Sequence, residues 1–228
     1  MILFDTYLYE RNNVKIKYKI QTATFDHTEE IIELMKKNFL NRETLTEYID
    51  FIKDAEACEA LEVLWKNIIR NGNVLIAVLI NSLENGIKII GVNLTNVVKK
   101  ETKFEINSEN KKYIQVLKIL NSISNSGKLF DIYHVEAYLD AMGLCVHSDY
   151  HGYQIGYRLL ESREKLCKSL GLSVTGTVFT SKISQHLALK LGFIVLSKIK
   201  CKDIDFGGLQ CKCPDEDEEI KFMARQYT

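Results

Sequence analysis

The stretch from Tyr138 to Leu170 constrains the fold more than any other part of the chain. An apolar run with strand character, Tyr138–Val146, leads into a short loop that contains Gly152 and Gly156, and a helical pattern follows. This helix would have one apolar side, formed by Leu159, Leu160, Leu166, Cys167 and Leu170. Its other side would be mostly charged, with Arg158, Glu161, Glu164, Lys165 and Lys168. A strand that runs directly into an amphipathic helix predicts an α/β fold.

The rest of the sequence continues this alternation. Further strands are expected at Val14–Thr22, Val74–Ile80, Ile87–Val98, Asp131–Val135, Val174–Phe179, Phe193–Cys201 and Lys221–Tyr227. Further helices are expected from Thr28 and at Leu45–Cys58, Leu61–Arg70, Tyr113–Ser124 and Ser181–Leu191. Asn85-Gly86 is typical of a hairpin turn between two of the strands. We therefore expect a mixed sheet flanked by helices.

The composition indicates one domain over residues 1–228. There is one proline, Pro214, and no Gly/Ser-rich linker, and 46% of the residues are hydrophobic. A formal net charge of zero argues against a nucleic-acid binder that works by bulk charge and against a polybasic membrane anchor. No window approaches the roughly 18 apolar residues of a membrane helix, and the N-terminus lacks the basic start of a signal peptide. We expect a cytoplasmic protein.

The loop at residues 147–156 could bind phosphate. A helix start presents unpaired amide N–H groups and the positive end of the helix dipole. Gly152 and Gly156 would let a ligand approach the backbone closely. The loop lacks the Lys-Ser/Thr ending of a P-loop and the three glycines of a dinucleotide turn. By itself this pattern also fits an ordinary tight turn.

Two segments give this loop a family context. The strand, the His-Gly-Tyr-Gln-Ile-Gly turn at 151–156 and the following helix resemble motif A of the GNAT acetyltransferases, [Arg/Gln]-x-x-Gly-x-[Gly/Ala]. The segment 178–185, followed by Leu191-Gly192-Phe193, resembles motif B of the same superfamily. The resemblance implies a GNAT fold with a twisted, mixed and mostly antiparallel sheet.

Further elements resemble the insect-type arylalkylamine (dopamine-like) N-acetyltransferases. They are Phe39-Leu40-Asn41-Arg42-Glu43-Thr44-Leu45, Ile90-Gly91-Val92, Thr180-Ser181-Lys182-Ile183-Ser184 and Phe222-Met223-Ala224. The sequence departs from the family at His151, where Arg or Gln is usual, at Gln154, where Gly is usual, and at Thr44, where Pro is usual. The Gln154 side chain could weaken coenzyme binding, or its amide could itself donate to phosphate.

The resemblance implies transfer of an acetyl group from acetyl-CoA to a small arylalkylamine of the dopamine, serotonin or tryptamine type. The implied coenzyme-binding residues are Leu144, Cys145, Val146, His151, Gly152, Tyr153, Gln154, Ile155 and Gly156. The implied oxyanion donors are backbone N–H groups near Cys145–Val146. The expected partners are acetyl-CoA and the amine, with no nucleic acid or membrane, and the chain is expected to be a monomer or weak homodimer.

The resemblance assigns Glu43 as the general base, acting through water, because a protonated amine cannot attack a thioester. Without the resemblance, Glu43 is an acid that opens the following helix. Thr180 and Ser184 would contact the coenzyme and return a proton to its thiolate, although capping of the next helix explains the hydroxyls as well. The position of the general-acid tyrosine of many GNAT enzymes is occupied by Ala188, as expected for the insect subfamily.

Aromatic residues of the helical insert, Phe39, Tyr48 and Phe51, are candidates for the acceptor pocket together with Phe179 of a later strand, with plain core packing as the alternative. Cys145 is expected to be a packed thiol and not a nucleophile. Cys201, Cys211 and Cys213 lack a CxxC pair, so no metal is expected. Two other functions stay open: a GNAT-like domain that binds coenzyme A without turnover, and an enzyme that acetylates a polyamine or another amine.

Overall fold

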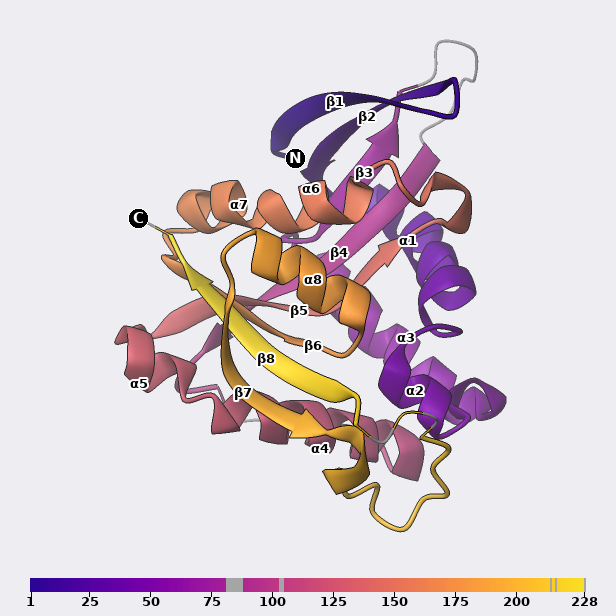
Figure 1. The fold of residues 1–228 in the computed structure, drawn as a ribbon, viewed down its shortest axis with the longest axis vertical. Helices are drawn as coiled ribbons and strands as arrows, with labels where there is room; N and C mark the ends of the chain where they lie inside the picture. Colours follow the sequence, from indigo (N-terminus) through magenta and orange to yellow (C-terminus); the bar gives the residue numbers. More distant parts are fainter. Residues whose placement is uncertain (81–87, 103–104, 214, 216, 228) are drawn as a thin grey trace.

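The structure is a computed structural model that describes residues 1–80, 88–102, 105–213, 215 and 217–227. Eight strands form one mixed sheet in the order β1-β2-β3-β4-β5-β6-β8-β7 (Figure 1). They are β1 (Leu3–Arg11), β2 (Val14–Thr22), β3 (Leu75–Leu79), β4 (Lys88–Lys99), β5 (Ala137–Val146), β6 (Val174–Phe179), β7 (Ile194–Lys200) and β8 (Glu219–Gln226). All neighbouring strands pair antiparallel except β5 and β6, which confirms the expected mostly antiparallel sheet.

Helices cover both faces of the sheet (Figure 1). One face carries α6 (Ile155–Glu161), α7 (Arg163–Ser169) and α8 (Lys182–Lys190). The other carries α1 (Thr28–Leu34), α3 (Ala55–Arg70) and α4 (Lys111–Ser126), with the short α2 (Thr44–Tyr48) and α5 (Leu129–Tyr133) beside them. None of the helices in the described part of the chain is both long and apolar enough to cross a membrane.

Strand β3 shows why this arrangement needs a continuous apolar run. Leu75 and Ala77 pack with the residues under α6 and α7, whereas Ile76 and Val78 pack in the core under α1 and α3. Successive side chains of a strand point to opposite faces, and here both faces are covered by helices. An alternating pattern would have left one face of β3 polar.

The parallel pair β5 and β6 forms a fork in the sheet. The two strands pair at one position, Leu139 with Thr175, and the Thr175 hydroxyl donates to the Leu139 carbonyl oxygen at 2.7 Å. Beyond this point the strands continue to Val146 and Phe179 without further pairing. The carboxyl end of β5 therefore has an open edge, because β4 occupies only its other side.

Strand β1 is an element that the sequence reading missed. It pairs with β2 through a tight turn at Asn12 and Asn13, whose φ angles are 50° and 62°. Two left-handed residues are typical of a two-residue hairpin turn, and asparagine tolerates that conformation. The Asn12-Asn13 pair is therefore the feature of the sequence that indicates this hairpin. Five of the nine residues of the strand are exposed and none is buried, so its apolar pattern is weak.

Several predicted boundaries were wrong. The helical region at 45–70 breaks between Tyr48 and Ala55, not near residue 60, because Asp50 is left-handed and Asp54 caps α3. Residues 131–135 were expected as a strand, but Leu129–Tyr133 is helix α5, bounded by left-handed residues on both sides. The helix after Gly156 is divided into α6 and α7 at Ser162. The predicted Asn85-Gly86 hairpin turn lies outside the described residues.

Candidate active site

The open edge of β5 presents backbone groups toward the fork. The His147 N–H donates to the Ile90 carbonyl oxygen of β4 at 3.0 Å. Because backbone groups alternate along a strand, the N–H of Cys145 also faces β4, and those of Leu144 and Val146 face the fork. This alternation makes Val146 and Leu144, rather than Cys145, the candidate oxyanion donors.

The turn after β5 leaves a run of backbone donors unpaired. Among the residues that the structure describes, none accepts a hydrogen bond from the backbone N–H groups of residues 152–157. Gly152 has φ +88°, a conformation that favours glycine. Gln154 has φ 60°, so it adopts a left-handed conformation that a glycine, as in motif A, would take without strain.

His151 and Gln154, the two positions at which this turn departs from motif A, each contact another part of the structure. The Gln154 Oε1 accepts a hydrogen bond from the Tyr9 hydroxyl of β1 at 3.2 Å, so the side chain is directed toward the N-terminal hairpin. The His151 Nε2 lies 3.0 Å from the carbonyl oxygen of Val146, which faces the fork. Gln154 is thus held toward the hairpin, and His151 contacts the open edge of β5.

Glu43 lies at the start of α2. Its Oε2 accepts a hydrogen bond from the Thr46 N–H at 2.7 Å, so one carboxylate oxygen caps the helix. The next residue, Thr44, donates through its hydroxyl to the Thr180 carbonyl oxygen at 3.0 Å. Residues 43 and 180 are 137 positions apart in sequence, and this contact brings their segments together at the end of β6.

The two hydroxyl candidates differ in their contacts. The Ser184 hydroxyl donates to the Ser181 carbonyl oxygen at 2.9 Å, and the Ser181 side chain caps α8 by accepting from the Ser184 N–H. In the described part of the chain, the Thr180 hydroxyl makes no side-chain hydrogen bond. Of the two hydroxyls, that of Thr180 is therefore the more available to a ligand.

Phe39 is the aromatic candidate that lies beside the fork. A five-residue π-helical segment, Met35–Phe39, ends at this residue, and such segments are frequent at functional sites. A Cβ built on Gly143 of β5 would lie 3.4 Å from the Phe39 ring and 2.8 Å from Met35 Cε. Glycine at 143 thus allows the helical insert to pack closely on β5.

The other aromatic candidates are in the core. The Tyr48 hydroxyl donates to Glu218 Oε2 at 2.7 Å, and Phe51 is buried in the same cluster of side chains. Phe179 packs edge-on against Phe193, with ring centroids 5.7 Å apart, in the cluster under α8. We therefore keep Phe39 as the main acceptor-site candidate.

Solved structures share the fold of this chain. A mosquito protein (Aedes aegypti) assigned as arylalkylamine N-acetyltransferase 7 superposes with a TM-score of 0.89, over 98% of this chain and 94% of that one, at 24% identity. The chain has the GNAT acetyltransferase fold. Polyamine N-acetyltransferase of Drosophila melanogaster, which forms N-acetylagmatine, gives 0.74 over 92% and 99% of the two chains, at 17% identity.

A more distant bacterial structure shares the GNAT fold. A protein of Salmonella typhimurium assigned as an acetyltransferase, solved with acetyl-CoA, gives a TM-score of 0.52 over 92% of this chain and 94% of that one, at 15% identity. No protein-family model matches the chain. Sequence identities of 15% to 24% show that the fold is similar and do not show a shared substrate.

A buried polar network at the base of the fork was not foreseen from the sequence. Arg163 of α7 is 1% exposed and donates to Asn93 at 2.7 Å and to the hydroxyls of Thr175 and Thr177 at 3.2 and 2.9 Å. Asn93 in turn donates to the Gly143 carbonyl oxygen at 2.8 Å. The sequence does not indicate that this charged helix residue is buried, because its partners come from two strands, β4 and β6, that are distant in sequence.

Asp140 completes this network from β5. Its Oδ1 accepts a hydrogen bond from the Thr177 hydroxyl at 3.0 Å. Burial raises the pKa of Asp140 to about 6, although Arg163 acts in the opposite direction. The network ties β4, β5 and β6 to α7 at the point where the fork of the GNAT fold opens.

The cysteines show no catalytic or metal-binding arrangement in the described part of the chain. Cys145 is buried, and burial raises the pKa of its thiol to about 12, so the protonated form predominates at neutral pH. Within the same residues, no group of three or more His, Cys, Asp or Glu side chains is placed to hold a metal ion.

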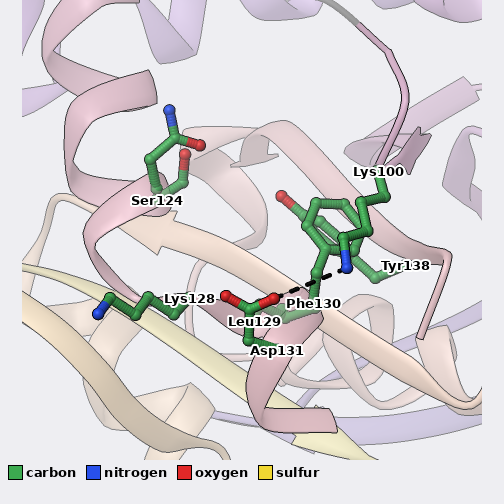
Figure 2. A pocket seen from close by; sticks show the side chains of 8 residues that line it. Lys100, Ser124, Lys128, Leu129, Phe130, Asp131 and Tyr138 are labelled. Atoms are coloured by element: carbon green, nitrogen blue, oxygen red, sulfur yellow. Dashed lines mark ion pairs between the residues drawn. The ribbon is translucent and has the colours of Figure 1, made fainter. Parts of the chain in front are cut away.

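Two surface cavities lie away from the fork. The first, of about 200 Å³, is lined by α4, α5 and β5, and Figure 2 shows Lys100 in it directed toward Asp131, at 3.7 Å. The second, of about 420 Å³, lies between β1 and the α6–α7 region and includes Asp5, Glu161 and Lys165. Neither is lined by a candidate residue of the GNAT site.

Proposed function

We propose that this chain is an acetyl-CoA-dependent N-acetyltransferase that acetylates the amine of a small arylalkylamine, such as dopamine, serotonin or tryptamine. The observation that carries the proposal is the fork between β5 and β6, whose open edge leads into six unpaired N–H groups at residues 152–157. The GNAT fold supports it, because acetyltransferases with this fold include one solved with acetyl-CoA.

The turn would hold the pyrophosphate of acetyl-CoA. Consecutive backbone N–H groups form a concave set of donors that suits phosphate oxygens. His151, Gly152, Tyr153, Gln154, Ile155 and Gly156 form this turn, and the Gln154 side chain is held away from it by Tyr9. The backbone groups of Leu144 and Val146 would bind the thioester end along the fork, with Cys145 between them.

The proposed chemistry uses Glu43 as the base and the Val146 N–H as the oxyanion donor. Glu43 accepts a proton from the ammonium group of the acceptor through water, and the free amine attacks the thioester carbonyl carbon. The Val146 N–H stabilises the resulting oxyanion. Collapse breaks the carbon–sulfur bond, and the nitrogen, which became positively charged on attack, loses its extra proton. The Thr180 or Ser184 hydroxyl relays this proton to the released thiolate. The products are the N-acetylated amine and free coenzyme A.

The acceptor would lie between the helical insert and β5, near Phe39. An aromatic ring beside the glycine of a strand offers a flat apolar surface for an aryl group. The likeness to a protein assigned as an arylalkylamine N-acetyltransferase supports this choice. Because a polyamine N-acetyltransferase has a similar fold, agmatine and putrescine are the second group of acceptors to test.

The proposal is tested by calorimetric titration with acetyl-CoA, followed by a thiol-release assay with tryptamine, dopamine, serotonin, agmatine and putrescine. We expect saturable acetyl-CoA binding and thiol release that depends on an arylalkylamine. Release with the polyamines alone would change the acceptor class. Binding without release for any amine would leave a coenzyme-binding domain, and no binding would reject the site.

A further inference from the structure

We propose that Arg11, on the N-terminal hairpin, supplies the positive charge that binds the pyrophosphate of the coenzyme. This inference rests on the proposed function, since it assigns a residue to the same acetyl-CoA site. Arg11 ends β1, far from the turn in sequence, and its Nη1 donates to the His151 carbonyl oxygen at 2.8 Å. The hairpin would thus be part of the coenzyme site.

The hairpin contacts the turn through the turn's acceptors. Besides the bond from Arg11, the Tyr18 hydroxyl of β2 donates to the Tyr153 carbonyl oxygen at 3.1 Å, and the Tyr9 hydroxyl donates to Gln154 Oε1. All three bonds use oxygen atoms of the turn. The hairpin therefore fixes the turn and leaves the N–H groups of residues 152–157 unpaired for an anion.

Arg11 lies directly on the backbone of the turn. A Cβ built on Gly152 would lie 1.7 Å from Arg11 Nη1 and 2.6 Å from Cζ, so the guanidinium occupies the space that a side chain at 152 would take. The N–H of Gly152 is also the first of the unpaired donors. A guanidinium has five N–H donors, and one bond to His151 leaves others for phosphate oxygens.

The neighbouring groups explain why a cation from the hairpin is needed. His151 occupies the position of the family's motif arginine or glutamine, and its ring contacts the Val146 carbonyl oxygen. Arg158 lies close by, but it pairs with Glu161 at 2.7 Å and donates to the Tyr9 hydroxyl. Lys88 lies over the Tyr150 ring, 5.3 Å from its centroid. Arg11 instead contacts the turn itself.

The test compares acetyl-CoA with S-acetylpantetheine, which carries the thioester but no pyrophosphate. Arg11→Ala removes the charge, and Arg11→Gln removes it but keeps an N–H donor for the His151 carbonyl. Lys15→Ala is the matched control, because it removes one positive charge from the exposed part of the same hairpin. Calorimetry gives the acetyl-CoA Kd, and thiol release gives kcat/KM for both donors.

We expect both Arg11 variants to raise the acetyl-CoA Kd about tenfold and to weaken its dependence on salt. Lys15→Ala should change the acetyl-CoA Kd less than about twofold. For all variants, kcat/KM with S-acetylpantetheine should stay within about twofold of wild type. Unchanged acetyl-CoA affinity in Arg11→Gln would overturn the inference and leave the proposed function intact. An equal loss with both donors would also overturn it, because Arg11 would then act only through the turn's conformation. No acetyl-CoA binding by wild type would reject the proposed function itself.

Discussion

The Thr44 hydroxyl donates a hydrogen bond to the carbonyl oxygen of Thr180, at 3.0 Å, and so connects the start of α2 to the end of β6. A proline at position 44, which is usual in the arylalkylamine N-acetyltransferases that the sequence resembles, has no hydroxyl and could not make this bond. In this chain the contact fixes the segment that carries Glu43 against the segment that carries Thr180 and Ser184. The segments that carry the proposed base and the proposed proton donors are therefore joined by one hydrogen bond.

Replacing Thr44 with valine should lower kcat more than it weakens acetyl-CoA binding. Valine has a similar shape but cannot donate, so the Thr180 carbonyl loses its partner and Glu43 is held less firmly. We expect a kcat loss of roughly tenfold and a stability loss of about 1 kcal/mol. Thr28→Val is the control, because Thr28, the first residue of α1, is similarly buried and donates to the carbonyl oxygen of Phe25, which precedes the helix. Equal kinetic effects of the two variants would contradict the prediction.

Glu43→Gln should abolish most of the turnover while keeping the protein folded. The amide oxygen of glutamine can still accept from the Thr46 N–H, but it cannot take a proton from the amine. A loss of 10²–10⁴ in kcat, in order of magnitude, is expected for a general base. Asp54→Asn makes the same chemical change at the N-cap of α3, where Asp54 accepts from the Ala57 N–H at 3.0 Å, and should leave kcat unchanged. Wild-type turnover by Glu43→Gln would reject the base assignment.

Asp140→Asn should flatten the dependence of stability on pH. The raised pKa of Asp140, about 6 against 3.8 unperturbed, means that the folded protein favours the protonated carboxyl. This contribution to stability is present below about pH 4 and is lost as the pH rises through about 6. Asparagine does not titrate, so the variant should gain roughly 1–3 kcal/mol relative to wild type between pH 4 and 7. Urea unfolding of both proteins at several pH values measures the free energy of unfolding. The prediction is wrong if the two plots of this free energy against pH are parallel.

Gln154→Gly should stabilise the protein by about 0.5–1 kcal/mol and preserve acetyl-CoA affinity. The left-handed backbone at 154 costs a residue with a Cβ about 1 kcal/mol that glycine does not incur, while the exposed bond to Tyr9 contributes little. Gln154→Val should destabilise, because a β-branched residue disfavours this conformation more strongly. The two unfolding free energies should thus move in opposite directions; a loss of stability in Gln154→Gly would show that the Tyr9 bond dominates.

Local pattern was enough to predict much of the sheet. Val14–Thr22 and Val174–Phe179 were predicted with the bounds of β2 and β6, and the strand–turn–helix order at 138–170 was correct. These elements carry strong apolar periodicity and clear turn residues, which are local signals. The motif at 151–156 indicated the fold for the same reason, since a turn that presents backbone donors needs particular residues at short spacing.

What the sequence determined by itself was the succession of strands and helices and the position of the turn that is rich in unpaired donors. Tertiary structure decided which distant residues meet there: Arg11 and Tyr9 at the turn, Thr44 at Thr180, and Arg163 with Asp140 at the base of the fork. These contacts join segments through hydrogen bonds that side chains of many types could make. Their partners are set by strand order and register, which no local periodicity encodes.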